Sequence, residues 1–463
     1  MDRSVTEPTP ETDSLRKRDG KPPFVMIDGF NLSLEKGTGV ATYARNLSFS
    51  LRNLGCEVGV LYGGSFSAGR SKLLREVLFF DSQVPTGGYV HRLWRKMRSL
   101  PRLSWNSAFE VPMTGAVISQ AFPSELPHYD TIWNARDLYV KASAQFDLFG
   151  AVNRVTTPRK PDLCHWTYPL PLKVGGVPNV YTLHDLVPLR LPFTTLDKKQ
   201  RYFRLLSWIA RTAAHIVTVS EHSKRDIVEL LGVDPAMVTN TYQAVNVPDE
   251  YRLKPEDEVR QEIEGTYGLA YGEYFLFFGS IEPKKNIGRM IEGYLASGVE
   301  TPLVIVGARA WKSKQELRML QADDGRSQLS LHASARIVRL EYAPYRLLVS
   351  LIRGAKAVLF PSLYEGFGLP ILESMSLGTA VLSSNTSSVP EVAGNAALLV
   401  NPYDTRAIAE GVRALADNDE LRANLIDRGF ARAALFSDAA YRQRLSTVYE
   451  SVLRSSSTLA RAR

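Results

Sequence analysis

Runs of consecutive apolar residues, rather than alternating ones, recur along the chain. In its first half they are FVMIDG (24–29), NVYTLHD (179–185) and HIVTVS (215–220). A strand with one solvated face alternates between apolar and polar residues, whereas a strand buried on both faces is apolar almost throughout. The runs therefore predict central strands of a parallel sheet.

The second half of the chain repeats this pattern more densely. Helical stretches such as KNIGRMIEGYLAS (285–297) and YRLLVSLIRGA (345–355) separate most of its apolar runs. Repeated alternation of strand and helix predicts an α/β fold whose parallel sheet is covered by helices on both faces. The strands predicted here are YFLFFGS (274–280), TPLVIVG (301–307), ARIVRL (335–340), AVLFPS (357–362), TAVLSS (379–384) and AALLV (396–400).

The chain has 463 residues, which is too long for one hydrophobic core and suggests two domains. Between the two series of strands the sequence becomes polar and proline-bearing, which is typical of a linker. We expect two doubly wound, Rossmann-like domains in tandem, with ligands bound at the C-terminal strand ends in the cleft between them. The predicted parts are a disordered leader (1–22), an N-terminal domain (23–246), a linker (247–272), a C-terminal domain (273–435), a helix that returns to the first domain (436–455) and a flexible tail (456–463).

The stretch from about 64 to 135 fits this pattern least well. Its segment HRLWRKMRSLPRLSW (91–105) mixes tryptophan and leucine with five cations. We interpret it as an excursion from the N-terminal domain with a solvated basic face. The alternatives are a surface that docks on anionic lipid headgroups and, with weaker support, a nucleic-acid contact. The five cations are Arg92, Arg95, Lys96, Arg98 and Arg102.

Composition narrows the class of protein. The formal net charge of +8 suits an anionic partner. No run of about 18 apolar residues is present, and the N-terminus lacks the apolar core of a secretory signal. Only two cysteines occur, Cys56 and Cys164, and isolated thiols of this kind favour a reducing compartment and a role as core filling. We therefore expect a cytoplasmic protein, with peripheral association at the inner membrane face as a further hypothesis.

Two acids flank a glycine-rich turn in LYEGFGLPILESMSLG (363–378). Pro370 fits the first position of a helix and Gly378 the position just beyond its end. None of the residues directly before Pro370 can cap the helix with its side chain, so the first N–H groups are expected to stay free and to form an anion site. Glu365 falls in the turn and Glu373 falls one turn into the helix. The plainer interpretation is that Glu373 complements the helix dipole and that Glu365 is a solvated loop residue.

Two other segments also suggest a bound anion. GSIEPKKNIGRM (279–290) places Lys284 and Lys285 directly before Asn286, an expected helix N-cap, where cations are unfavourable unless something negative lies there. Near the N-terminus, Gly37 and Gly39 stand between the first strand and the first helix, where backbone N–H groups can approach a phosphate closely. Exposed lysines and an ordinary tight turn are the alternatives.

Together these motifs resemble the family-four retaining glycosyltransferases of the GT-B fold. The resemblance covers the chain from about residue 24 to its end and is weakest between 64 and 150. It rests on the E-x7-E element EGFGLPILE (365–373), with FFGSIEPKKNI (277–287), TVSEHSKRDI (218–227), VYTLHDLVPLRLPF (180–193) and GTGVATYARNL (37–47).

The resemblance implies a site for a nucleotide diphosphate sugar. Glu373 would bind the ribose hydroxyls, and Glu365 would lie beside the transferred sugar. Lys285 would neutralise the diphosphate, aided by the backbone near Gly39, and His184 would orient the sugar. The N–H groups of the turn, which would bind the hexose and the distal phosphate, are those of Phe367, Gly368 and Leu369.

Two departures from the family pattern bear on the predicted site. Ser280 stands where many relatives carry an arginine on the diphosphate, so phosphate binding would depend more heavily on Lys285. Glu341 stands where relatives usually show a glycine in the loop that reads the base, so the sequence does not determine which base the nucleotide carries.

We expect a retaining hexosyltransferase that needs no metal or other cofactor. Its donor is expected to be GDP-mannose, and its acceptor a saccharide or lipid-linked saccharide in polysaccharide or glycan biosynthesis. The alternatives are a UDP-sugar-dependent glucosyl-type transferase, a sugar-nucleotide epimerase of the same fold and a non-catalytic nucleotide-sugar sensor. Nucleic acid is not expected as a partner.

Overall fold

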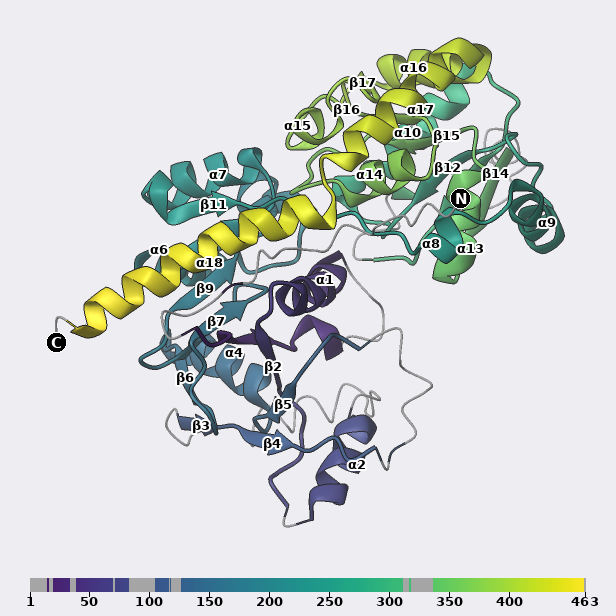
Figure 1. The fold of residues 1–463 in the computed structure, drawn as a ribbon. Coiled ribbons are helices and arrows are strands. Elements are labelled where there is room, and N and C mark those ends of the chain that lie inside the picture. Colours follow the sequence, from purple (N-terminus) through teal and green to yellow (C-terminus); the bar gives the residue numbers. More distant parts are fainter. Residues whose placement is uncertain are drawn as a thin grey trace, which may run out of the picture. The chain divides into compact units, whose positions relative to one another are not determined.

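The computed structural model describes residues 15, 20–33, 39–69, 71–82, 105–115, 117, 126–310, 316–317 and 336–461. The chain forms two compact units. The first comprises Met1–Leu183, Arg204–Val217 and Arg442–Arg463, and the second comprises His184–Phe203 and Thr218–Tyr441. Within the described ranges, no helix combines the length and apolarity needed to cross a membrane. Figure 1 shows the elements in sequence colours.

An eight-stranded sheet has the strand order β11-β10-β9-β7-β1-β2-β5-β4; seven of its strands belong to the first unit, and β11 falls among the residues of the second. From β10 to β5 neighbouring strands are parallel, and β4 pairs with β5 in the antiparallel direction. The strands are β1 (Phe24–Asp28), β2 (Glu57–Tyr62), β4 (Phe109–Val111), β5 (Thr131–Asn134), β7 (Leu163–Trp166), β9 (Asn179–Thr182), β10 (His215–Thr218) and β11 (Val238–Asn240). The apolar runs at 24–29, 179–185 and 215–220 are therefore confirmed as parallel strands.

Helices and a small second sheet complete this unit. The small sheet has the order β3-β6-β8, from β3 (Trp105–Ser107), β6 (Asn153–Thr156) and β8 (Leu172–Val174). The longer helices are α1 (Gly39–Asn53), α2 (Lys72–Ser82), α4 (Leu138–Phe149), α6 (Lys199–Thr212) and α18 (Asp438–Arg461), and a short helix η1 (Asn31–Ser33) follows β1.

The described part of the 64–135 stretch is not a mere excursion, because β4 and β5 belong to the main sheet. Strand β5 is only four residues long and includes Asn134, whose side chain bonds both the N–H and the C=O of Gly64. Such a short and partly polar strand gives almost no signal in the sequence. The five cations from Arg92 to Arg102 lie outside the described residues.

Helix α18 is tied to the first unit by a buried histidine. The Nδ1 atom of His165 on β7 lies 2.5 Å from the hydroxyl of Tyr449, and its Nε2 atom lies 2.7 Å from Thr182 Oγ1. His165 is fully buried, and both of its ring nitrogens have partners within this unit. The two cysteines are buried and unbonded, which confirms their role as core filling.

The second unit contains a six-stranded sheet of order β14-β13-β12-β15-β16-β17, and its neighbouring strands are parallel. The strands are β12 (Phe275–Phe278), β13 (Leu303–Val306), β14 (Ile337–Leu340), β15 (Ala357–Phe360), β16 (Val381–Ser384) and β17 (Leu398–Val400). All six were predicted from their apolar runs.

Helices surround this sheet, and α10 packs against α16 while α14 packs against α17. The helices of the second unit are α5 (Val187–Arg190), η3 (Pro192–Thr194), α7 (Glu221–Leu231), η4 (Pro235–Met237), α8 (Asp249–Arg252), α9 (Glu256–Tyr267), η5 (Pro283–Lys285), α10 (Ile287–Ser297), α13 (Tyr345–Arg353), α14 (Leu369–Ser376), α15 (Val389–Ala393), α16 (Thr405–Asp417) and α17 (Asp419–Ala434). The stretch 247–272 holds α8 and α9, and α18 continues to Arg461 into the stretch predicted as a tail. The domain boundaries stay predictions.

The ends of β12 and β13 approach each other so closely that only glycine fits. A Cβ atom on Gly307 would lie 1.8 Å from the carbonyl oxygen of Gly279. We expect Gly307→Ala to lower the free energy of unfolding by about 3 kcal/mol or more, because backbone must move to make room. Gly265→Ala on the exposed side of α9 is the control, since nothing lies within 4 Å of its Cβ position. It should stabilise the chain by about 0.5–1 kcal/mol. Urea unfolding of both variants measures this, and equal stabilities would contradict it.

Candidate functional site

The turn between β15 and α14 leaves a row of backbone N–H groups unpaired. Gly368 is the N-cap of α14, with a φ of 107°, and no side chain caps this helix end. Within the described residues, the N–H groups of residues 366–369 donate to no other group. Successive free amides at the positive end of a helix form an anion site. The free amides and the left-handed Gly378 behind the helix, with a φ of 78°, are as the sequence analysis predicted, and the anion site stays a prediction.

Two serines hold the turn in this shape. The N–H of Glu365 donates to Ser387 Oγ at 3.0 Å. The hydroxyl of Ser388 lies 2.9 Å from the carbonyl oxygens of both Glu365 and Phe367. These bonds engage the carbonyl groups of Glu365 and Phe367 and so fix the shape of the turn, while the amides of residues 366–369 stay free. No local pattern indicated these serines, which follow β16 and lie more than 20 residues after the turn.

Glu365 forms a buried ion pair with Lys285. Its Oε1 atom lies 2.8 Å from Lys285 Nζ, and the two side chains are only 6% and 11% exposed. The lysine nitrogen also lies 4.7 Å from the centre of the Phe360 ring, a cation–π contact. Burial alone would raise the pKa of Glu365, but the charges of Lys285 and Lys284 outweigh it and hold that pKa below its ordinary value. Glu365 is therefore a carboxylate at neutral pH.

The lysines before α10 thus have partners within the protein. Lys284 Nζ lies 4.0 Å from the carboxylates of both Asp185 and Glu282. The sequence analysis inferred a bound anion from these two cations, and protein carboxylates supply much of that negative charge. Lys285 lies beside the turn because its partner, Glu365, is the acid of that turn.

Asn286 occupies the N-cap of α10, as predicted, but its side chain does not cap the helix. Its backbone is left-handed, with a φ of 60°, and its Nδ2 atom donates to the carbonyl oxygens of Pro361 and Pro402 at 3.0 and 2.7 Å. The expected cap is therefore wrong in detail. The side chain instead ties the lysine segment to the end of β15.

Glu373 has the opposite environment to Glu365. It lies in the second turn of α14, partly buried, and no described group hydrogen-bonds its carboxylate. Burial raises its pKa to about 7. Its charge contributes to raising the pKa of Tyr345, after burial of that phenol. A partly buried carboxylate without a partner is costly, and such groups mark binding sites.

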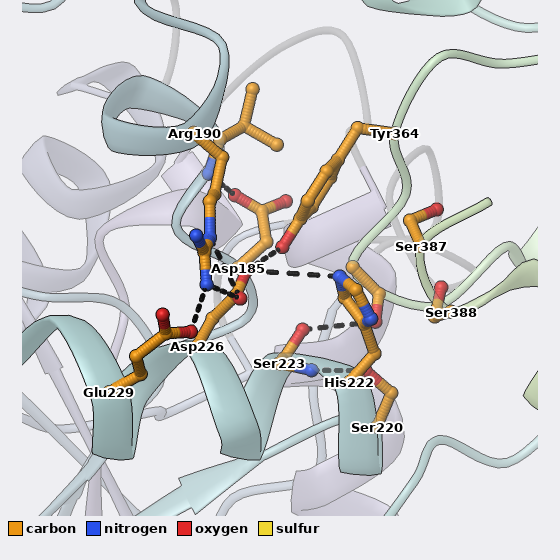
Figure 2. A network of polar contacts seen from close by, with 12 residues as sticks. Asp185, Arg190, Ser220, His222, Ser223, Asp226, Glu229, Tyr364, Ser387 and Ser388 are labelled. Carbon is orange, nitrogen blue, oxygen red and sulfur yellow. Dashed lines mark hydrogen bonds and ion pairs between the residues drawn. The ribbon is translucent and has the colours of Figure 1, made fainter.

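The His184-Asp185 pair packs directly against the turn. A Cβ atom on Gly366 would lie 2.7 Å from the carbonyl oxygen of His184 and 2.9 Å from Asp185 Cβ. The hydroxyl of Ser223 lies 3.0 Å from the carbonyl oxygen of His184 and 3.3 Å from that of Gly366. Figure 2 shows Asp185 and Ser223 in this region. The structure therefore brings His184 to the same turn as Glu365.

Ser280 and Glu341 contact residues that are close to them in the sequence. Ser280 is exposed and its hydroxyl donates to Glu282 Oε1 at 3.1 Å. Glu341 is exposed and accepts from Arg339 at 2.8 Å. Gly39 begins α1 in the first unit, and Gly37 lies outside the described residues. Among the residues that the structure describes, no three His, Cys, Asp or Glu side chains form a metal-ligand group.

Two family models match most of the chain. The model for glycosyl transferases group 1 matches residues 262–432, and the model for Glycosyltransferase Family 4 matches residues 116–247. The chain belongs to the family-four glycosyltransferases. The first model covers the lysine segment, the turn and both acids.

Relatives of this glycosyltransferase include several mannosyltransferases. O-antigen chain mannosyltransferase B of Escherichia coli is 33% identical over 265 residues, which are 56% of this chain and 66% of that protein. The serotype-specific mannosyltransferase WbdA of Escherichia coli is 28% identical over 281 residues, 58% of this chain and 33% of that protein. The matches thus span 66% of one of these relatives and a third of the other. The MMP alpha-(1->4)-mannosyltransferase of Mycolicibacterium hassiacum is 24% identical over 430 residues, 90% of this chain and 95% of that protein.

Solved structures establish the GT-B fold. Sucrose-phosphate synthase from Thermosynechococcus elongatus has a TM-score of 0.60 at 16% identity, and the match covers 94% of this chain and 100% of that one. Anabaena HepE in complex with UDP-glucose has a TM-score of 0.61 at 16% identity, covering 93% and 100%. The predicted fold class is therefore confirmed.

Proposed function

We propose that this glycosyltransferase transfers a hexosyl unit to a saccharide or lipid-linked saccharide acceptor. The hexose is mannose and its donor is GDP-mannose. The reaction retains the anomeric configuration of the donor. The observation that carries the proposal is the row of free N–H groups at 366–369, beside a buried lysine and two acids in opposite environments. This combination suits a sugar diphosphate, which needs many fixed donors for its oxygens and acceptors for its hydroxyls. Glycan biosynthesis is the setting that the relatives favour.

Bond breakage at the sugar determines what the site must do. When the bond between the anomeric carbon and the phosphate oxygen breaks, negative charge moves onto the diphosphate. Donors that are already in place stabilise that charge at little reorganisation cost. In this proposal the amides of Phe367, Gly368 and Leu369 and the ammonium of Lys285 supply the donors, with the backbone near Gly39 and the Ser280 hydroxyl at the margin. No metal or other cofactor has a part in it.

The acids have separate roles in this proposal. Glu365, kept ionised by Lys285, lies beside the sugar and accepts hydrogen bonds from its hydroxyls near the reacting carbon. His184, against the same turn, orients the sugar. Glu373 accepts from the two ribose hydroxyls, and this hydrogen bonding would favour its charged form and lower its pKa. The acceptor is held by the N-terminal domain, and the protein acts in the cytoplasm.

A panel of nucleotide sugars tests the proposed donor. Thermal unfolding is measured with GDP-mannose, UDP-glucose, ADP-glucose and dTDP-glucose. At about 100 times its Kd a ligand that binds only the folded state adds roughly 2.7 kcal/mol, so GDP-mannose should give the largest shift. A larger shift with UDP-glucose would favour the glucosyl-type alternative, and no shift with any donor would contradict the proposal.

Two rival functions are separated by what happens to the bound donor. Incubated without acceptor, an epimerase converts the donor to another sugar nucleotide, whereas a transferase at most hydrolyses it slowly. A sensor binds the donor but releases no nucleotide diphosphate over a broad panel of saccharide acceptors. With the right acceptor we expect GDP release and, by NMR, a product with the anomeric configuration of the donor. An inverted product would contradict the retaining mechanism.

A further inference from the structure

A buried aspartate on α7 binds the residue next to Glu365. Asp226 is 3% exposed, and its Oδ2 atom accepts a hydrogen bond from the hydroxyl of Tyr364. Tyr364 is 6% exposed, and its ring lies edge-on to His222, with the ring centres 5.4 Å apart. Burial and this bond to Asp226 raise the pKa of the phenol, so Tyr364 stays a hydrogen-bond donor. Figure 2 shows Tyr364 pointing toward Asp226.

Arg190 balances the charge of this aspartate. Asp226 Oδ1 accepts from Arg190 Nε at 2.8 Å and from Nη2 at 2.5 Å, while Nη2 also lies 2.5 Å from Glu229 Oε2. His222 Nε2 lies 3.9 Å from Asp226 Oδ2. A buried carboxylate is costly unless it is paired and hydrogen-bonded, and each oxygen of Asp226 has such a partner. Arg190 therefore lets a full negative charge face the phenol.

Both neighbours of Glu365 in the sequence are bound to α7. Tyr364 is held through its hydroxyl by Asp226, and Gly366 is held through its carbonyl by the Ser223 hydroxyl at 3.3 Å. Asp226 and Ser223 lie three residues apart and so share one face of the helix. The backbone on each side of Glu365 is thus fixed by the same rigid element. Even a small displacement of a catalytic group can lower the reaction rate by a large factor.

We propose that Asp226 is a positioning residue for Glu365, acting through Tyr364, with Arg190 as its counter-ion. Asp226 acts on the substrate only through other residues. It holds the phenol of Tyr364, and the phenol in turn restrains the backbone at 364–365. That backbone orients the carboxylate of Glu365, which Lys285 keeps ionised. This inference rests on the proposed function for its effect on rate. Its geometric part, the restraint of the turn by α7, stands independently.

Tyr364→Phe tests the proposal most cleanly, because it deletes only the hydroxyl and leaves Asp226 paired with Arg190. Because a hydrogen bond to a charged group is a strong restraint, its loss should lower kcat about tenfold to hundredfold. The donor KM should change by less than about threefold. Asp226→Asn should have the same effect. The double variant should be no slower than the slower single one, because both act through one bond.

Glu229→Gln is the matched control. Glu229 also binds Arg190, but its side chain is 67% exposed and it does not contact Tyr364. Its kcat should stay within about twofold of the parent, as expected for an exposed ion pair. If all three variants lower kcat equally, or if Tyr364→Phe leaves kcat unchanged, Asp226 does not position Glu365.

Amide hydrogen exchange gives a readout that needs no turnover. In a peptide covering 363–369, Tyr364→Phe and Asp226→Asn should speed exchange about tenfold or more while Glu229→Gln should not, because local opening becomes easier once the restraint is lost. Unchanged exchange in Tyr364→Phe would overturn the proposal. If the parent protein turns over no donor, the proposed function fails, whereas the exchange data still decide whether α7 restrains the turn.

Discussion

Glu365→Gln is expected to reduce kcat by about a thousandfold or more, with nearly unchanged affinity for the nucleotide diphosphate. The carboxylate lies in the turn beside the free amides, and its ion pair with Lys285 keeps it charged. A neutral amide can still fill the space, but it cannot stabilise positive charge that develops on the sugar. The interactions that hold the nucleotide, at Glu373 and at the backbone amides, are untouched.

Turnover assays and titration calorimetry with the nucleotide diphosphate measure this effect. Glu410→Gln is the control, since Glu410 is an exposed acid on α16 that pairs with Arg406. The substitution also leaves Lys285 buried without its counter-charge, which costs about 3–5 kcal/mol when one partner of a buried pair is removed. Adding Lys285→Met should restore part of the stability and none of the activity. Full activity in Glu365→Gln would remove Glu365 from the mechanism.

Glu373→Gln is expected to raise the donor KM by about tenfold to hundredfold and to change kcat little. Its carboxylate has no partner in the described structure, so it is available for the paired hydroxyls of a ribose. A glutamine offers one neutral acceptor oxygen in place of two charged ones. The kinetic constant that changes distinguishes the two acids. Substitution of Glu365 should lower kcat, and substitution of Glu373 should raise the donor KM.

The same substitution should change the pH dependence of stability. Burial raises the pKa of Glu373 to about 7, from an ordinary value of 4.5 in the unfolded chain. Between these two values the folded state binds more protons, so the stability of the parent falls as pH rises from about 4.5 to about 7. Glu373→Gln lacks this penalty, and without donor it should be more stable than the parent by roughly 1–3 kcal/mol at pH 8. The difference should disappear near pH 4.5, and a pH-independent difference would contradict the assignment.

The sequence predicted those parts of the site that are encoded locally. Apolar runs gave every strand of the second sheet, and the glycine and proline positions around Leu369 gave the free end of α14. Contacts between distant segments were beyond this reasoning. Lys285 and Glu365 are 80 residues apart, and Asp226 and Tyr364 are 138 apart. Nothing in their local patterns indicates that these residues meet.

Errors arose where a side chain found a better partner than the local one. Asn286 was expected to cap α10 but instead bonds two proline carbonyls, because its left-handed backbone turns the amide toward them. Strands such as β4 (FEV) and β5 (TIWN) were missed because polar residues interrupt them, so that no apolar run marks them.

The central claim is that a sugar diphosphate binds at the free end of α14, between Lys285 and Glu373. A crystal structure of the protein soaked with its preferred nucleotide sugar tests it directly. We expect the phosphate oxygens to accept hydrogen bonds from the amides at 366–369 and from Lys285, with the ribose hydroxyls on Glu373. Density for the nucleotide at any place remote from Lys285 and Glu373 would contradict the account.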